Sequence, residues 1–488
     1  MLRALSPVRV LCLTSIAGAL ALGLAAPASA ATIKVTTSAD EFNAGSKCSL
    51  REAIWSANHD VASMAPGCTS GSGADLVKVP AGTYNLTIAG AGEQLDATGD
   101  LDVTAPVTIV HTGDGTATVN AQSLDRVFEV NAAGGAAVTI SGLVIEGGSP
   151  PSATDGGGIL NSAGVLSLSD STVTSNLSLR HGGGIETTSS GITNVVNSTI
   201  SANSANVDGG GVDNSGGTTS LINATVTANT ADADSNGFGQ AGGIGNFGRT
   251  TNLRSTIVAG NIDKGGQVPD CINVAGSTLA SQGQTLIGNP TGCAYSAAAG
   301  DITGVDPKLG ALAFNGGRTP THALLPGSPA LDKGAGCAKT DQRGIPRSAG
   351  GACDIGAYEL VRCHGKVANR TGTNHDDVLT GTPGPDAFLL LGGNDRAMGL
   401  GGNDVFCGAA GRDTEIGGPG DDRAYGDTGA DRLVGGPGKD LLAGGRGADE
   451  LLGGGGKDLL RGGGSDDLCK TGPGADRASG CETNRKVP

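Results

Sequence analysis

A set of evenly spaced aspartates near the C-terminal end constrains the fold of this chain more than any other sequence feature. Twelve aspartates recur at a strict nine-residue period. They are Asp377, Asp386, Asp395, Asp404, Asp413, Asp422, Asp431, Asp440, Asp449, Asp458, Asp467 and Asp476. A period this short and regular predicts a stack of equivalent turns, and it disfavours a disordered linker rich in glycine and aspartate.

The segment from Gly435 to Ala443, with the sequence GGPGKDLLA, shows the typical unit. It matches the pattern G-G-x-G-x-D-x-U-x, and the region resembles the calcium-binding nonapeptide repeats of RTX proteins. The resemblance implies a parallel β-roll in which two units form one coil, so that odd and even units stack on opposite edges. Ca²⁺ takes about six to eight oxygen ligands, and it would lie between stacked units.

The expected calcium ligands are the carboxylates of the twelve aspartates together with the backbone of the glycines two residues before them. These glycines are Gly384, Gly393, Gly402, Gly411, Gly420, Gly429, Gly438, Gly447 and Gly456. Six units on each edge leave five gaps, which gives an upper estimate of about ten ions. Without metal the module collects carboxylates around a small apolar core, so we expect it to be loose until calcium binds.

Some units depart from the pattern. Glu415 occupies the apolar eighth position of its unit, and we expect its neighbour Ile416 to substitute for it in the core. Three units place only a small side chain there, namely Ala397, Ala424 and Ala478. Calcium binding should therefore be strongest from Asp386 to Asp458 and weakest at the two ends.

Residues 1–30 predict export. Arg3 and Arg9 are followed by an apolar run over residues 10–24 and by small residues at 28–30, which is typical of a cleaved signal peptide. The run is short for a membrane-spanning helix, so we expect a secreted, extracellular protein, with retention at the cell surface as an alternative. The net charge of −15 makes nucleic acid or an anionic membrane an unfavourable partner.

Ten cysteines remain once residues 1–30 are removed, because Cys12 lies within that segment. An even number of cysteines in an exported protein favours disulfides over thiol chemistry. Pairing between sequence neighbours suggests Cys48–Cys68, Cys271–Cys293, Cys337–Cys353, Cys363–Cys407 and Cys469–Cys481.

A short amphipathic helix is predicted directly after Cys48. Ser49 and Glu52 form a capping box, and apolar residues follow at positions 50, 53, 54 and 57. Such a helix can cover the open end of a strand stack, which would otherwise aggregate. The string CSLREA at residues 48–53 resembles the N-terminal CSLREA domain of secreted bacterial proteins.

Residues 75–265 are repetitive, with Gly-Gly-Gly-Ile/Val at 156–159, 182–185 and 209–212. A period of 26 or 27 residues predicts stacked supersecondary units, here one rung of a right-handed parallel β-helix per period. Stacking should align two sets of asparagines, whose amides can bond one another at the turns. The sets are Asn161, Asn214 and Asn246, and Asn176, Asn203 and Asn229.

The period is lost over residues 300–360, where five short motifs occur in order. They are 306–310 (DPKLG), 315–317 (NGG), 326–332 (PGSPALD), 341–344 (DQRG) and 353–359 (CDIGAYE). The series resembles the choice-of-anchor Q domain of bacterial surface proteins, which implies that it closes a pectin-lyase-like β-helix.

The expected fold is all-β, a right-handed parallel β-helix followed by a calcium-binding parallel β-roll. We divide the chain into a signal peptide (1–30), an N-terminal strand with the cap helix (31–74), the β-helix (75–299), the closing region (300–360), a linker (361–371), the nonapeptide β-roll (372–480) and a C-terminal tail (481–488).

Parallel β-helices often act on polysaccharides, so a catalytic site has to be considered. Aligned rungs place Asp155, His181 and Asp208 in one column, with Glu186 and Asp213 nearby. Paired carboxylates suit glycosidic chemistry, but solvated turn residues are the interpretation that we favour. The signatures of alginate epimerases and polygalacturonases are absent from the sequence.

The sequence thus favours a calcium-binding protein with Ca²⁺ as its cofactor and a role in binding or adhesion outside the cell. The expected partners of the β-helix are surface glycans or another surface protein. A polysaccharide lyase, epimerase or hydrolase is the second hypothesis.

Overall fold

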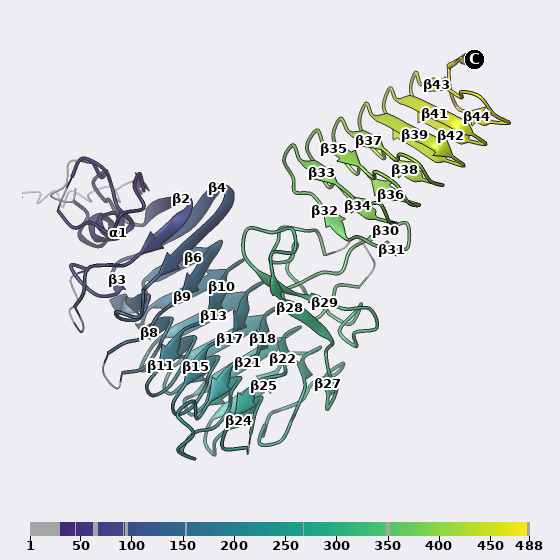
Figure 1. Cartoon of the computed structure of the whole chain (residues 1–488). Coiled ribbons are helices and arrows are strands. Elements are labelled where there is room, and N and C mark those ends of the chain that lie inside the picture. Colours follow the sequence, from purple (N-terminus) through teal and green to yellow (C-terminus); the bar gives the residue numbers. More distant parts are fainter. Residues whose placement is uncertain are drawn as a thin grey trace, which may run out of the picture.

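The computed structural model describes residues 30–485 except 44, 62–66, 91, 93–95, 152–153, 267 and 348–351. The expected signal peptide lies outside the described residues, apart from Ala30. Two stacks of short strands follow one another along the chain, joined by an irregular segment (Figure 1). Over the described ranges, no helix is long and apolar enough to cross a membrane.

The N-terminal cap consists of β1 (Thr32–Lys34), which pairs with β2 (Asp75–Asn85), and of α1 (Leu50–His59). The expected capping box of Ser49 and Glu52 is present, and the side chains at 50, 53, 54 and 57 are buried. Helix α1 packs against β2 and against β3 (Leu101–Val103) at one end of the stack. The prediction of a cap helix is therefore confirmed.

The β-helix is built from short strands that pair in parallel from rung to rung, in columns. The first column contains β3, β5 (Phe128–Asn131), β8 (Ile159–Ala163), β12 (Ile185–Thr187), β16 (Val212–Asn214), β20 (Ile244–Asn246) and β24 (Cys271–Asn273). The second contains β6 (Ala137–Ser141), β9 (Val165–Ser169), β13 (Ile192–Val196), β17 (Thr218–Ile222), β21 (Thr250–Arg254) and β25 (Thr278–Ser281).

The third column contains β7 (Leu143–Glu146), β10 (Thr172–Thr174), β14 (Thr199–Ser201), β18 (Thr225–Thr227), β22 (Ile257–Val258), β26 (Leu286–Ile287) and β27 (Ile302–Thr303). The long strand β4 (Val107–Asn120) joins the second and third columns and pairs with β2. The short fourth column contains β11 (Leu177–Ser178), β15 (Ser204–Ala205), β19 (Thr230–Ala231) and β23 (Ile262–Asp263), and a single 3₁₀ turn, η1, covers Ala133–Gly135.

One period of the sequence forms one rung, as predicted. Ile185 in β12 pairs with Ile159 on one side and with Val212 on the other, so neighbouring rungs are offset by the sequence period. Alternate side chains of strands such as β9 and β13 point inward and are buried. Small β-branched and aliphatic residues therefore fill the interior in place of aromatic rings.

One predicted asparagine column is confirmed and the other is only partly formed. Asn176 Nδ2 donates to Asn203 Oδ1 at 2.9 Å, and Asn203 donates to Asn229 at 3.0 Å. In the other column Thr187 stands between Asn161 and Asn214, because the rung between them carries threonine at this position. Asn161 therefore aligns with Asn214 as expected but is separated from it by one rung, whereas Asn214 and Asn246 bond directly.

The region that we expected to close the β-helix lies along its side. After β27 the chain forms a hairpin of β28 (Leu309–Ala313) and β29 (Thr321–Leu324) and runs back beside the third column (Figure 1). Gln342 is buried and donates to Thr172 Oγ1 at 2.9 Å, while Thr199 Oγ1 donates to Gln342 at 2.7 Å. Rows of outward threonines on β10 and β14 thus bind this region.

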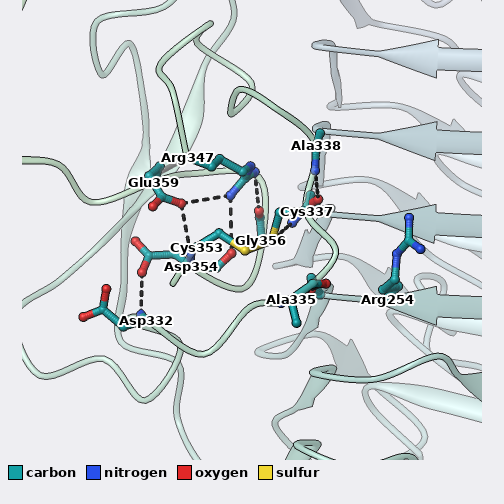
Figure 2. Close-up of a disulfide and its surroundings, with 12 residues drawn as sticks. Arg254, Asp332, Ala335, Cys337, Ala338, Arg347, Cys353, Asp354, Gly356 and Glu359 are labelled. Carbon is teal, nitrogen blue, oxygen red and sulfur yellow. Dashed lines mark hydrogen bonds and ion pairs between the residues drawn. A yellow bond between two sulfur atoms is a disulfide. The ribbon is translucent and has the colours of Figure 1, made fainter. Parts of the chain in front are cut away.

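A compact polar core holds the lateral region together (Figure 2). Cys337 and Cys353 form a disulfide, and Arg347 beside it contacts Glu359 Oε2 at 3.2 Å and the Gly356 carbonyl at 2.8 Å. Arg347 is 2 % exposed, and its five donors need such partners when they are buried. The other four expected disulfides are also formed.

The β-roll follows a short hairpin of β30 (Arg362–Cys363) and β31 (Lys366–Val367). One of its sheets contains β32 (Arg370–Thr371), β34 (Ala387–Leu389), β36 (Val405–Cys407), β38 (Arg423–Tyr425), β40 (Leu441–Arg446), β42 (Leu459–Gly464) and β44 (Arg477–Ser479). The other contains β33 (Val378–Thr380), β35 (Arg396–Met398), β37 (Thr414–Ile416), β39 (Arg432–Gly438), β41 (Glu450–Gly456), β43 (Leu468–Lys470) and β45 (Thr483–Arg485).

Successive strands of the chain alternate between the two sheets of the roll, so equivalent residues lie 18 positions apart, as with Leu433 and Leu451. The core is a single row from each sheet, including Phe388, Phe406, Leu442 and Leu460 on one side. The fold class inferred from the sequence, all-β with parallel stacks, is confirmed.

Candidate metal centre

The repeating aspartates form two ladders along the edges of the roll. The backbone N–H of each aspartate donates to Oδ1 of the aspartate 18 residues later, as Asp422 does to Asp440 at 2.9 Å. The same bond recurs from Asp377 to Asp467 on one edge and from Asp386 to Asp476 on the other. One coil of the roll contains two nine-residue units, and each unit contributes one aspartate turn. Alternate units therefore stack on opposite edges.

The second carboxylate oxygen of most ladder residues is buried and lacks a hydrogen bond. Within the described part of the chain, Oδ2 has no hydrogen-bond partner in Asp395, Asp404, Asp413, Asp422, Asp431, Asp440, Asp449, Asp458, Asp467 and Asp476. Asp404, for example, is 0 % exposed. A buried, unpaired carboxylate is unfavourable unless a cation or a proton compensates its charge.

In most units the second carboxylate oxygen faces the first glycine of its own unit. A Cβ built on Gly426 would lie 2.5 Å from Asp431 Oδ2 and 2.7 Å from the Gly444 carbonyl oxygen of the next turn. Equivalent positions at 399, 408, 417, 435 and 444 are approached by the same two kinds of oxygen. Glycine is required there because a side chain would occupy the space where the carboxylate and the carbonyl converge.

The glycines that we singled out from the sequence lie at a different place in the turn. A Cβ on Gly429 would overlap the carbonyl oxygen of Gly411, the equivalent glycine one coil earlier, and Gly420 and Gly438 are related in the same way. These residues have φ between +140° and +155° at Gly411, Gly420 and Gly438, which side chains rarely adopt. Sequence reasoning thus missed the first glycines of the units, whose carbonyls lie beside Oδ2, although the pattern conserves both positions along the chain.

Burial changes the protonation of the ladder. Desolvation raises the pKa of Asp395, Asp431 and Asp440 to about 7, and neighbouring ladder carboxylates add to this. Backbone N–H donors act in the opposite direction but do not outweigh burial. A cation between the turns would replace the proton as the compensating charge.

The N-terminal units differ from the rest. Thr382 donates its backbone N–H and, at 2.9 Å, its hydroxyl to Asp386 Oδ2, and Asn369 donates to Oδ1 at 2.9 Å. Although burial opposes it, these bonds lower the pKa of Asp386. Thr373 bonds Asp377 in the same way. Asp386 therefore resembles the weak first unit, which differs from our expectation that it belongs to the strong series.

At the C-terminal end, Glu482 extends one ladder. Asp467 donates its N–H to Glu482 Oε2 at 2.6 Å, which is the bond that another ladder aspartate would accept. The disulfide between Cys469 and Cys481 ties this last turn to the core of the roll.

Glu415 lies in the core of the roll, and the expectation that Ile416 substitutes for it is wrong. Glu415 is 0 % exposed and stands between Ala397 and Leu433 in the central row, while Ile416 on the other face is only half-buried. Successive side chains of a strand point to opposite faces, and in β37 it is residue 415 that points into the roll. A Cβ on Gly408 would lie 3.2 Å from Glu415 Oε1 and 2.7 Å from Asp413 Oδ2, so both carboxylates face one cradle.

The β-helix brings its own acidic residues together. Asp155, His181 and Asp208 stack in one column as expected, since Gly156 and Gly182 bond the carbonyls of His181 and Asp208. His181 Nδ1 lies 3.4 Å from Asp208 Oδ2, and this carboxylate raises the pKa of the histidine.

Behind this column lie two carboxyl groups with no exposure. Glu186 and Asp213 pair directly on neighbouring strands β12 and β16. Burial raises the pKa of Asp213 to about 7, and burial with the nearby Asp213 raises that of Glu186 well above its ordinary value. Burial therefore favours the neutral form of both side chains.

The RTX calcium-binding nonapeptide repeat matches the chain in four copies, at residues 371–406, 380–415, 416–451 and 444–478. These segments coincide with the ladders and their glycine turns. No curated protein and no solved structure matches the chain. The C-terminal roll therefore consists of RTX repeats that bind Ca²⁺.

Proposed function

We propose that the protein is exported and acts outside the cell as a binding or adhesion protein, with a roll that folds when it meets extracellular calcium. The observation that carries the calcium part is the row of buried Oδ2 atoms, most of which face the first glycine of their unit. The five disulfides and the sequence of residues 1–30 support export.

The ladder aspartates would hold the ions through Oδ2, together with carbonyl oxygens of the glycine turns. Calcium is a hard cation that binds oxygen at about 2.3–2.6 Å, and this donor set contains only oxygen. Bound ions supply positive charge between stacked carboxylates and connect one coil to the next. The repulsion within each ladder then becomes attraction, so binding and folding are coupled.

Calcium titration of the full chain tests this proposal. Circular dichroism should show a gain of β signal between chelator and millimolar calcium. Asp422→Asn should raise the calcium concentration at which the β signal appears. Asparagine places either a neutral oxygen, which is a weaker ligand, or an N–H donor at the position of Oδ2. Asp421→Asn is the matched control, since Asp421 is exposed and bonds Lys439 through an oxygen that asparagine retains. Equal titrations for all three proteins would contradict the assignment.

For the β-helix we propose a ligand face that binds surface glycans or another surface protein. The column of Asp155, His181 and Asp208 supports this, because these side chains are 15–23 % exposed on consecutive rungs. A glycan array probed in calcium should give binding that Asp208→Ala weakens. If the protein binds no glycan on the array and captures no surface protein, a binding role is contradicted.

The second candidate function is a polysaccharide lyase, epimerase or hydrolase. It is favoured by one observation, namely that the buried pair Glu186 and Asp213, whose pKa values are raised, lies next to the His181–Asp208 contact. Turnover of a polysaccharide that disappears in both Asp208→Ala and Glu186→Gln would favour the enzyme. Binding without turnover would favour the adhesin.

A further inference from the structure

A second group of buried carboxylates lies in the first rung of the β-helix, beside the cap helix α1. Asp102 in β3 and Glu129 in β5 pair directly across the first rung, and Asp100 immediately precedes β3. One carboxylate oxygen from each of the three lies within 4.8 Å of the others. Their exposures are only 1 %, 7 % and 2 % respectively, so the group is enclosed.

Helix α1 covers this group. Arg51 donates to the Asp100 carbonyl at 2.9 Å, and Asn58 donates to the Asp102 carbonyl at 2.6 Å. The carboxylates therefore lie at the seam between the cap helix and the first rung. Figure 1 shows α1 beside β3 at this end of the β-helix. A ligand held at the seam would connect the cap to the stack.

Negative charge exceeds positive charge at the seam. Arg126 contacts Asp100 Oδ2 at 3.1 Å and also contacts Glu129, while Arg51 is shared with Asp40 and Asp96. Among the described residues, these two guanidinium groups lie among six carboxylates, which also include Asp102 and Asp125.

Asp125 provides a second, independent observation beside this group. It is 3 % exposed, and its Oδ2 has no hydrogen-bond partner among the described residues. This oxygen points towards Gly99, next to Asp100, where a Cβ would lie 2.8 Å from it. Gly99 has φ +66°, so the chain turns sharply to bring Asp100 and Asp125 together.

We propose that Asp100, Asp102 and Glu129, with Asp125 beside them, bind one divalent cation of the calcium type at this seam, independently of the roll. The donors are all carboxylate oxygens, which suit calcium and do not favour zinc or copper. The ion would fix the cap on the first rung after export.

Terbium luminescence can test the site in the full chain, because Tb³⁺ substitutes for Ca²⁺ and is excited by a nearby tryptophan. Trp55 is the single tryptophan, and it lies in α1 between Arg51 and Asn58, far from the roll. Excitation at the red edge of tryptophan absorption should give terbium emission that calcium competes away. Absence of this emission from the wild-type protein would overturn the proposal.

Variants separate the seam from the roll. Asp102→Asn combined with Glu129→Gln should abolish the tryptophan-excited emission, whereas Asp422→Asn should leave it unchanged. Trp55→Phe should abolish the emission without changing the number of terbium ions bound in equilibrium dialysis, which shows that only the reporter was lost.

If the double variant does not fold, Glu129→Gln alone is used, and circular dichroism confirms its fold. Emission unchanged in a folded variant would contradict the site, even if calcium still orders the roll. Loss of roll folding with intact emission would contradict only the proposed function.

Discussion

At the scale of single residues, Glu415 is where the local sequence conflicts with the fold. It stands in the apolar row of the roll, and burial raises its pKa well above the ordinary value, with Asp413, Asp431 and Asp427 adding to the effect. Both of its carboxylate oxygens are buried without a hydrogen bond in the described structure. We therefore expect the residue to destabilise the metal-free roll, with a proton or a cation beside Gly408 compensating its charge.

Glu415→Leu should stabilise the calcium-free roll by about 1–3 kcal/mol, because an unpaired polar group is replaced by an apolar side chain. Chemical denaturation in chelator, followed by circular dichroism, measures this change. The control is Glu450→Leu, which removes a partly exposed carboxylate bonded to Arg432 and Lys470 and should cost about 0–1 kcal/mol. A destabilising effect of Glu415→Leu in chelator would contradict the assigned burial.

At the scale of elements, the ladder behaves as one electrostatic unit. Stacked strands hold equivalent carboxylates one strand spacing apart, about 4.8 Å, so each ionisation affects its neighbours. Burial raises the pKa of Asp431 and Asp440 to about 7, above the value of about 3.9 in an unfolded chain. Protons therefore bind the folded roll more tightly than the unfolded one.

The metal-free roll should accordingly be most stable in acid. Its stability is fully present below about pH 4 and is lost as the pH rises through about 7, since the raised carboxyls then ionise in the folded state. Melting temperatures in calcium-free buffer should fall from pH 5 to pH 8. In saturating calcium the trend should reverse, because protons compete with the ion. A calcium-free roll that gains stability with rising pH would refute this account.

At the scale of the whole molecule, a small apolar cluster joins the roll to the rest of the chain. Ile345 of the lateral region and Val361 pack with Leu389 and Val405 of the roll. The disulfide between Cys363 in β30 and Cys407 in β36 crosses the same junction and encloses a segment with a sequence separation of 44. The first coils of the roll are therefore held in place even before calcium binds.

Removing this disulfide with Cys363→Ala and Cys407→Ala should cost about 4 kcal/mol, from the entropy of the long loop in the unfolded chain. The loss should be visible as a higher calcium midpoint in the folding titration. Cys337→Ala with Cys353→Ala is the control, because that disulfide lies in the lateral region, away from the roll. Similar calcium midpoints for the two double variants would contradict the idea that the Cys363–Cys407 junction helps the roll to fold.

Periodicity was sufficient to predict much of this molecule. The nine-residue aspartate period determined the roll, its two edges and its metal, and the glycine-rich period of 26 or 27 residues determined the rungs. The cap helix followed from Ser49, Glu52 and the apolar spacing behind them. These features rest on contacts between repeats or within one turn, so their geometry is encoded in a short stretch of sequence.

The tertiary structure alone decided where non-repeating segments lie and which groups are left without partners. Neither the lateral path of residues 300–360 nor the seam of Asp100, Asp102 and Glu129 has a period, because each depends on contacts between distant segments. The same is true of the burial of Glu415 and of the hydrogen-bonded Asp386. Sequence spacing determines which residues repeat, whereas burial and charge compensation depend on everything packed around them.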